Sequence, residues 1–135
     1  MAKPDKLKFF YCKHCGNLVQ MVQNTGVPVV CCHEPMLELV ANTADAAQEK
    51  HVPVAELENG VLNVCVGSVE HPMNDEHYIQ FVCVETDCGT LLTYLSPDDA
   101  PKAQFVIPPC QTPLAVYEYC NLHGLWKLDL SAQAK

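Results

Sequence analysis

Four cysteines near the start of the chain constrain its fold more than any other feature. Cys12 and Cys15 form a Cys-x-x-Cys motif followed by Gly16, and an adjacent pair, Cys31-Cys32, comes later in the same segment. The glycine allows the backbone to fold back so that N–H groups face sulfur, and four thiolates make a tetrahedral site for Zn²⁺ or a single iron. Because residues 1–38 contain little else that could form a core, we expect a small module stapled by a metal ion.

The spacing of these cysteines leaves the identity of the metal open. Zinc is the commoner ion for four thiolates, so a structural zinc ribbon is one interpretation. The adjacent ligands Cys31 and Cys32 count against zinc, because zinc ribbons usually repeat the two-residue gap. His14 and His33 lie beside the cysteines, but a complete tetrahedron would leave them as exposed loop residues.

Composition narrows the classes of function. The chain has 135 residues, nine of them cysteine, and a formal net charge of −8. A chain this acidic is a poor candidate for binding nucleic acid or an anionic membrane surface, because neutralising phosphates requires a basic face. The N-terminal segment lacks the apolar core of a signal peptide, and no apolar run is long enough to cross a bilayer. We therefore expect a cytoplasmic protein whose cysteines are metal ligands or buried thiols.

The rest of the chain is predicted to be β. Residues 41–48 are small and polar and read as a linker, and residues 35–48 are at most a weak helix. Five strand-length runs follow, each bounded by Pro, Gly, Asn or Asp, at residues 61–66, 78–84, 90–95, 104–107 and 114–119. Short strands at regular spacing are typical of a β-sandwich. We expect an all-β chain made of two domains, 1–38 and 39–135.

Four histidines and one late cysteine form a second candidate site, and they are His51, His71, His77, Cys120 and His123. Taken singly, each histidine would more often be a surface or core residue than a ligand. His71 and His77, however, flank a turn just before a predicted strand, and Cys120 and His123 lie where another strand ends. Structural zinc sites close at four ligands, so five ligands indicate a redox metal with one position open for a small molecule.

These motifs resemble those of the two-iron superoxide reductases called desulfoferrodoxins. Residues 9–38 are similar to the desulforedoxin module, through Cys12-Lys-His-Cys15-Gly-Asn and Cys31-Cys32-His-Glu-Pro-Met. Residues 49–126 are similar to the neelaredoxin module, through Glu49-Lys-His-Val-Pro-Val, Gly67-Ser-Val-Glu-His-Pro-Met, Glu76-His-Tyr-Ile and Tyr119-Cys-Asn-Leu-His-Gly-Leu-Trp126. The resemblance covers nearly the whole chain, and the motifs occur in the family's order.

The resemblance implies two iron ions per chain. The four N-terminal cysteines would hold an Fe(Cys)₄ centre that stores or relays an electron. The four histidines of the second site would surround another iron in its equatorial plane, with Cys120 as the axial ligand. His123 would bind through Nδ1 and the other histidines through Nε2. The resemblance also implies a homodimer and an immunoglobulin-like β-sandwich for the second module.

The reaction that the resemblance implies is the one-electron reduction of superoxide to hydrogen peroxide, with the electron supplied by a small donor such as rubredoxin. Lys50 is the candidate cation that attracts the anion and positions a proton-bearing water. Glu49 is the candidate carboxylate that binds the oxidised iron after peroxide leaves. Both could instead be a solvated surface pair, but their position directly before His51 favours the catalytic interpretation.

Two other functions stay open at this point. An electron-transfer or metal-storage protein would keep both irons without a reactive open position, and an interaction module with structural zinc would be colourless. Cys65, Cys83, Cys88 and Cys110 are not ligands in the family, and we expect them to be small buried hydrophobes. Cys83 is expected on a strand face with Ile79 and Phe81, and Cys88, in a predicted turn, could instead be a reactive thiol. His33 stands where relatives often carry glycine, which predicts strained backbone at that turn.

Overall fold

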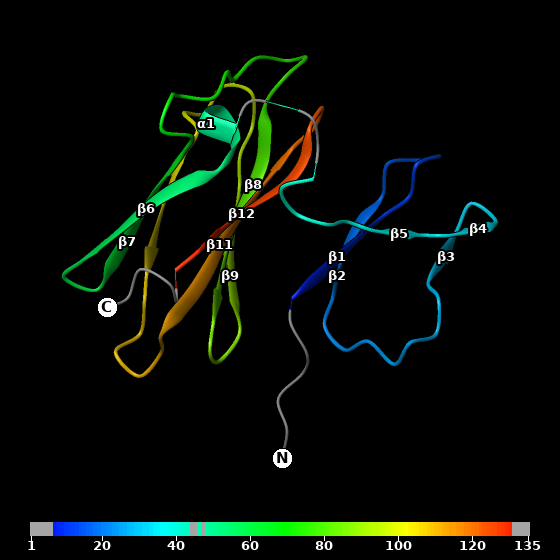
Figure 1. The fold of residues 1–135 in the computed structure, drawn as a ribbon, viewed down its shortest axis with the longest axis horizontal. Coiled ribbons are helices and arrows are strands. Elements are labelled where there is room, and N and C mark those ends of the chain that lie inside the picture. The colour runs from blue at the N-terminus through cyan, green and yellow to red at the C-terminus, as the bar shows by residue number, and fades with distance from the viewer. Residues whose placement is uncertain (1–6, 44–45, 47, 131–135) are drawn as a thin grey trace. The chain divides into compact units, whose positions relative to one another are not determined.

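The computed structural model describes residues 7–43, 46 and 48–130. The chain divides into two compact units, Met1–Val40 and Ala41–Lys135, and both are built mainly from β-strands (Figure 1). Residues 1–6 of the first predicted domain, residues 131–135 of the second, and residues 44, 45 and 47 of the predicted linker lie outside the described residues. Within the described ranges, no helix is both long and apolar enough to span a membrane.

The first unit consists of two small antiparallel sheets. β1 (Lys8–Tyr11) lies between β2 (Leu18–Met21) and β5 (Leu37–Glu38). The second sheet is a short hairpin of β3 (Val30–Cys31) and β4 (Glu34–Pro35). Cys31 lies in β3, Cys12 and Cys32 directly follow β1 and β3, and Cys15 lies in the turn between β1 and β2. The small sheets therefore serve chiefly to hold the four cysteines.

The weak helix expected within residues 35–48 is wrong over most of its length. Pro35 belongs to β4, and Leu37 pairs with Tyr11 of β1. The described helix, α1 (Gln48–His51), is a single turn at the end of the expected range. Pairing with β1 decides the structure of Leu37–Glu38, because strand formation depends on the neighbouring strand more than on local preference.

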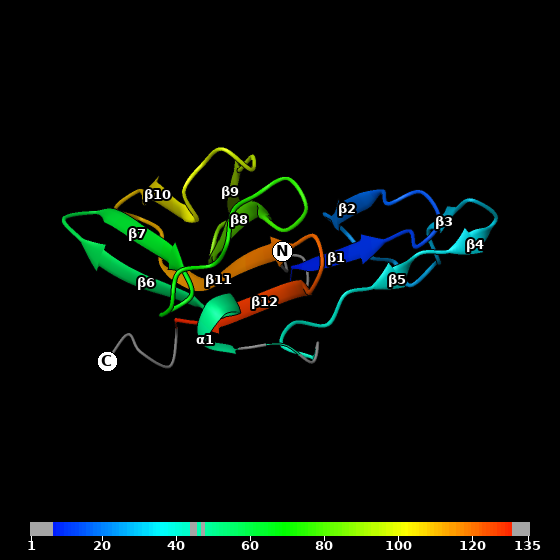
Figure 2. The same cartoon turned by 90° about the horizontal axis from the view of Figure 1, so that it is seen from above.

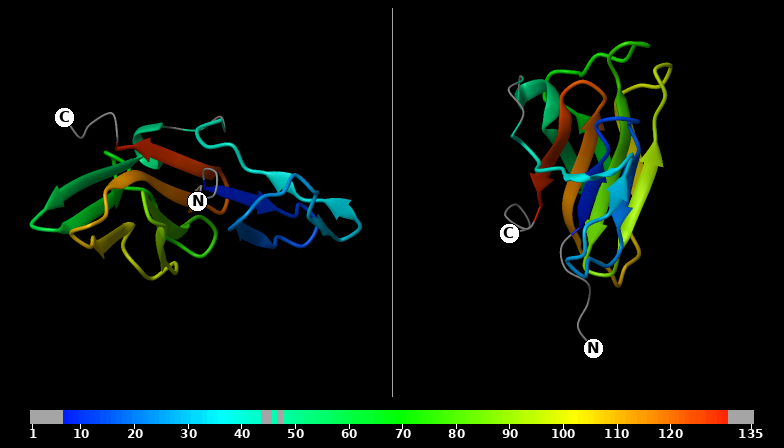
Figure 3. Two further views of the ribbon diagram at one scale, coloured as in Figure 1. Left: turned by 90° about the horizontal axis from the view of Figure 1, so that it is seen from below. Right: turned by 90° about the vertical axis from the view of Figure 1, so that its right-hand side faces the viewer.

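The second unit contains two antiparallel sheets, which confirms the predicted β-sandwich. The sheets have the strand orders β10-β7-β6 and β12-β11-β8-β9. The strands are β6 (Pro53–Glu58), β7 (Val61–Val66), β8 (Ile79–Thr86), β9 (Thr90–Tyr94), β10 (Lys102–Val106), β11 (Pro113–Cys120) and β12 (Gly124–Asp129). Figures 2 and 3 show these strands from further directions. Buried side chains of both sheets, among them Leu62, Val64, Val82 and Val116, form one core cluster.

All five predicted strands are present, but β6 and β12 were missed. Both are edge strands of their sheets. β6 begins at Pro53 and continues into exposed Glu56 and Glu58, and β12 begins at Gly124. Pro and Gly are weak strand formers, so these segments are held by pairing with β7 and β11 rather than by local preference.

A shift in register between β8 and β11 reorients side chains next to the second site. The pairing changes from Tyr119 with Phe81 to Cys120 with Ile79. Ile79 therefore joins the core cluster, whereas Phe81 stacks on Tyr119 with ring centroids 5.9 Å apart. The prediction that Cys83 shares a face with Ile79 is wrong, because a bulge breaks the two-residue alternation of a regular strand.

The four additional cysteines differ in their surroundings. Cys83 is fully buried, as predicted, but Cys65, Cys88 and Cys110 are exposed, and for these three the prediction is wrong. Cys65 faces outward because the alternate residues of β7 point into the core. Cys88 lies in the turn between β8 and β9, and Cys110 lies in the loop before β11.

Gly67, directly after β7, generates a first prediction. Its φ is +86°, and a Cβ there would clash with the carbonyl oxygens of Val69, Lys50 (2.6 Å) and Glu49 (2.8 Å). These are backbone atoms and cannot rotate away. We expect Gly67→Ala to lower the free energy of unfolding by about 3 kcal/mol or more, as a left-handed backbone penalty of about 1–2 kcal/mol plus steric overlap.

Gly60→Ala is the matched control for this measurement. Gly60 has a similar φ of +80°, but an added Cβ would meet no atom within 4 Å. It should therefore cost only the backbone penalty of about 1–2 kcal/mol. Urea unfolding of both variants provides the comparison, and equal losses would show that Gly67 is not needed for close packing.

Candidate metal centres

The four N-terminal cysteines converge on one point. The Sγ atoms of Cys12, Cys15, Cys31 and Cys32 all lie within 4.8 Å of one another, and those of Cys15 and Cys31 are 3.5 Å apart. We refer to this group as the first centre. Four converging sulfurs match the coordination of a tetrahedral thiolate site, so the donor set fits iron or zinc.

Two turns bring these cysteines together. After β1, Gly16 has a φ of +84° and its N–H donates to the carbonyl oxygen of Cys12 at 2.9 Å. In the β3–β4 hairpin, Cys32 and His33 have φ values of 52° and 67°. The strained backbone expected at His33 is therefore present, and it extends to the adjacent ligand candidate.

Mutual interactions alter the acidity of these thiols. A hydrogen bond from the backbone N–H of Cys15 is the main factor that lowers the pKa of Cys12 to about 6. Hydrogen bonding to the Cys15 side chain is the main factor that raises the pKa of Cys32 to about 12. Closely spaced thiolates repel one another, so the cluster does not ionise fully by itself, whereas a bound cation would favour four thiolates.

The histidines beside the first centre are exposed, as expected. His14 Nε2 lies 3.1 Å from a carboxylate oxygen of Glu34, and Lys13 Nζ lies 3.6 Å from the same oxygen. His14 and then Lys13 lower the pKa of Glu34. His14 thus contacts the Glu34 carboxylate at the surface.

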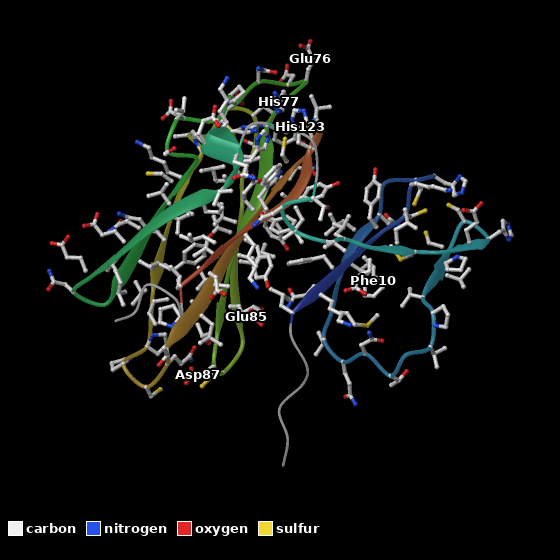
Figure 4. All side chains as sticks on the ribbon, in the orientation of Figure 1. Phe10, Glu76, His77, Glu85, Asp87 and His123 are labelled. Atoms are coloured by element: carbon white, nitrogen blue, oxygen red, sulfur yellow. The ribbon has the colours of Figure 1, made fainter. Side chains whose placement is uncertain are left out.

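A second convergence involves all five residues predicted for the other site. His51 Nε2 lies 3.1 Å from His123 Nδ1 and 3.3 Å from His71 Nε2. The ligand atoms of His51, His71, His77 and Cys120 lie within 4.8 Å of one another, and Cys120 Sγ is 3.9 Å from His123 Nδ1. We refer to these five residues as the second centre. Figure 4 shows His77 and His123 at the same end of the second unit.

Three segments far apart in sequence supply the second centre. α1 carries His51, and the loop between β7 and β8 carries His71 and His77. Cys120 ends β11, and His123 lies in the turn to β12, where Gly124 has a φ of +82°. Since α1, this loop and β11 belong to different parts of the sandwich, only the folded second unit can assemble the cluster.

The hydrogen bonds of the imidazoles show which nitrogens face the centre. His71 Nδ1 lies 2.6 Å from the carbonyl oxygen of Pro72. A carbonyl only accepts, so Nδ1 carries the proton and Nε2 keeps its lone pair. His77 Nε2 is buried and has no hydrogen-bond partner among the described residues. A buried nitrogen that lacks a partner, directed at other lone pairs, is satisfied by a cation, so the residues fit a metal ion.

Burial favours the neutral form of the second centre. Desolvation lowers the pKa of His71 to about 4. Desolvation also lowers the pKa of His77, and electrostatic repulsion from His123, His51 and Lys50 lowers it further. Desolvation raises the pKa of the Cys120 thiol, while hydrogen bonds from backbone N–H groups just after it oppose this effect. Neutral imidazole is the form that binds metals.

Two residues beside the second centre were not singled out by the sequence. Trp126 stacks on His51 with centroids 4.9 Å apart, and its Nε1 donates to the carbonyl oxygen of His123 at 3.1 Å. Glu118 is fully buried, and its carboxyl oxygens have no hydrogen-bond partner among residues 7–43, 46 and 48–130. Burial raises its pKa well above the usual value. Glu118 is the one acidic residue in the sequence of β11, and this pattern could have drawn attention to it.

Glu49 and Lys50 are exposed on α1 next to His51. The carbonyl oxygen of Glu49 accepts hydrogen bonds from the N–H of Val69 at 2.9 Å and the hydroxyl of Ser68 at 3.3 Å. The positive charge of Lys50 contributes to the lowered pKa of His77. Lys50 is therefore close enough to the second centre to act on it electrostatically.

Both units of this chain are similar in sequence to known proteins. The family model described as "Desulfoferrodoxin" matches residues 43–129, and the one described as "Desulfoferrodoxin, N-terminal domain" matches residues 4–39. The desulfoferrodoxin of Syntrophotalea carbinolica is 47% identical over 125 residues, covering 93% of this chain and 98% of the relative. That of Nitratidesulfovibrio vulgaris is 41% identical over 126 residues, with the same coverage.

Solved structures show a similar fold. The superoxide reductase from Treponema pallidum is 40% identical, with a TM-score of 0.79 over 93% of this chain and 100% of that chain. The 1Fe superoxide reductase from Giardia intestinalis is 30% identical, with a TM-score of 0.51 over 59% of this chain and 95% of that chain.

The buried histidines predict the acid sensitivity of the metal-free protein. The pKa of His71 is about 4 in the folded state and about 6.5 in an unfolded chain, so the unfolded state binds more protons between these values. The free energy of unfolding should be highest above pH 6.5 and should fall by up to about 3 kcal/mol as the pH falls to 4.

Urea unfolding at a series of pH values, followed by the fluorescence of Trp126, measures this effect. His71→Asn keeps an amide donor for the carbonyl oxygen of Pro72 and should reduce the pH dependence. His14→Asn, which removes an exposed histidine, should leave it unchanged. A His71→Asn variant with the full wild-type slope would contradict the assignment.

Proposed function

Since this chain belongs to the desulfoferrodoxin family and is a superoxide reductase, we propose that the second centre holds the iron at which superoxide is reduced to hydrogen peroxide. The ligands would be His51, His71, His77, Cys120 and His123. The reaction consumes one superoxide, one electron and two protons for each hydrogen peroxide formed. We propose a second iron at the four cysteines of the first centre.

The observation that carries this proposal is the convergence of four imidazoles and one thiol. His77 Nε2 is buried and has no hydrogen-bond partner within the residues that the structure describes, and His51 Nε2 lies 3.1 Å from His123 Nδ1. Structural zinc closes at four ligands, so this larger set fits a redox metal better. Imidazole suits iron, and a thiolate tunes its potential. When bound, iron supplies one electron to superoxide and recovers it from a donor.

The side chains around the second centre would have separate tasks. Lys50 would attract the superoxide anion in a protein of net charge −8 and hold a water that delivers a proton. Glu49 would supply a carboxylate to the oxidised metal after product leaves. Cys120 is fully buried, so its sulfur is shielded from water and from released peroxide.

The first centre would store or relay the electron. Cys15 and Cys32 are exposed, which supports electron entry from a small rubredoxin-like donor at the surface.

We also propose a homodimer located in the cytoplasm. The first unit leaves Val22, Val27 and Val30 at 76%, 71% and 62% exposure, and association of two copies would cover such apolar side chains.

Reaction of the reduced protein with superoxide is the decisive measurement for this function. Reduced protein with about two irons per chain should consume superoxide rapidly after the radiolysis pulse. Each superoxide should remove one electron from the second centre. Cys15→Ser, which disables the first centre, should retain this fast step. Loss of the fast step in Cys15→Ser, or its absence in the wild type, would contradict the assignment.

Removal of Lys50 should slow the encounter with superoxide. We expect Lys50→Ala to lower the second-order rate constant about tenfold and to weaken its dependence on salt, because local positive charge raises association rates by about 10–10³-fold. Lys102→Ala is the matched control, since it removes the same charge from an exposed residue of β10. Equal effects of the two substitutions would indicate that net charge, not position, sets the rate.

A further inference from the structure

The side chain of Asn121 bridges two segments of the second centre. Asn121 lies between Cys120 and His123 in sequence, but its carboxamide reaches the loop that carries His77. Its Nδ2 donates to the carbonyl oxygen of Glu76 at 3.0 Å, and its Oδ1 accepts from the N–H of Tyr78 at 2.9 Å. One side chain therefore holds the peptide groups on both sides of His77.

The backbone of Asn121 adds a third contact. Its N–H donates to the carbonyl oxygen of Tyr78 at 3.2 Å. The regular pairing of β8 with β11 ends at Ile79 and Cys120, one residue past a register shift. The contacts of Asn121 thus continue the connection between the two segments beyond the point where the sheet stops.

The loop before His77 needs such a restraint. Residues 74–76 are exposed, and Asn74 holds only the loop itself, through hydrogen bonds from the N–H groups of Glu76 at 3.1 Å and His77 at 2.9 Å. These bonds shape the turn but do not attach it to the rest of the centre. Asn121 supplies an attachment to the segment that carries the thiolate.

The chemistry of the contacts requires an asparagine. The partner of Nδ2 is a carbonyl, which only accepts, and the partner of Oδ1 is an N–H, which only donates. The orientation of the carboxamide is therefore fixed, and a carboxylate could satisfy only one of the two partners. A shorter hydroxyl could not span both peptide groups.

We propose that Asn121 is a positioning residue that locks His77 against the segment carrying Cys120 and His123 and thereby sets the metal affinity of the second centre. The inference rests on the proposed ligand set. Groups that orient metal ligands commonly change metal affinity about 10–100-fold when they are removed. The first centre belongs to the other compact unit of the chain, so it serves as an internal reference.

Release of iron to a chelator measures this role. In iron-loaded Asn121→Ala, the second centre should lose iron at least about tenfold faster than in the wild type, while the first centre should lose it at the wild-type rate. The thiolate-to-iron absorption of the oxidised second centre should also shift, because the position of Cys120 relative to His77 changes. The bands of the first centre should not shift.

Asn42→Ala is the matched control. Asn42 makes the same pair of hydrogen bonds to one backbone residue, since its Nδ2 donates to the carbonyl oxygen of Lys127 at 3.2 Å and its Oδ1 accepts from the N–H of Lys127 at 2.8 Å. It lies at a φ of 64°, so alanine there should destabilise the metal-free protein at least as much as Asn121→Ala. Iron release from Asn42→Ala should nevertheless match the wild type.

The outcomes separate the inference from the function on which it rests. A wild-type protein that holds no iron at the second centre would overturn the proposed function. A wild type that holds iron, with release from Asn121→Ala unchanged or accelerated only as much as in Asn42→Ala, would overturn the role of Asn121. If Asn121→Ala does not fold, Asn121→Asp keeps the acceptor for Tyr78 and should release iron at least about threefold faster. Wild-type release from that variant would equally reject the inference.

Discussion

The convergence of unshared electron pairs at the second centre is the constraint on which the rest of the second unit depends. His51 Nε2 lies 3.1 Å from His123 Nδ1 and 3.3 Å from His71 Nε2, and His77 Nε2 is buried with no hydrogen-bond partner in the described part of the chain. Burial keeps the imidazoles neutral, because it lowers the pKa of His71 and His77, and it opposes ionisation of Cys120. Such an arrangement is unfavourable by itself and becomes favourable when a cation is shared among the ligands.

The two centres lie in units that differ in the size of their cores and in how far they bury their candidate ligands. In its described residues the first unit has short strands and few buried side chains, so four thiolates around one ion would supply the cross-links that a small core cannot. Its Cys15 and Cys32 are exposed, which suits exchange of electrons at a surface. The second centre is assembled by a β-sandwich, and Cys120 and His71 are buried within it. That burial suits a reaction in which water and product must be kept from the thiolate.

Residues outside the proposed ligand set orient several imidazoles of the second centre. The carbonyl of Pro72 selects the free nitrogen of His71, Trp126 contacts both His51 and His123, and Asn121 holds the peptide groups around His77. Each of these contacts helps to orient an imidazole toward the second centre. Ligand orientation of this kind is a large part of metal affinity in proteins.

The sequence by itself predicted the residues of both candidate metal centres from cysteine and histidine motifs. It also predicted five strands of the sandwich from β-branched runs, because spacing and residue type are local properties. Only the tertiary structure decided how these parts meet. Edge strands β6 and β12 form through pairing with partners, a bulge rather than alternation places Ile79 in the core, and Cys65, Cys88 and Cys110 are exposed where burial was expected. Asn121 contacts Glu76 and Tyr78, and Trp126 stacks on His51, all of which are distant in sequence. Burial, register and hydrogen-bond partners depend on what lies opposite in space, and a linear pattern does not contain that information.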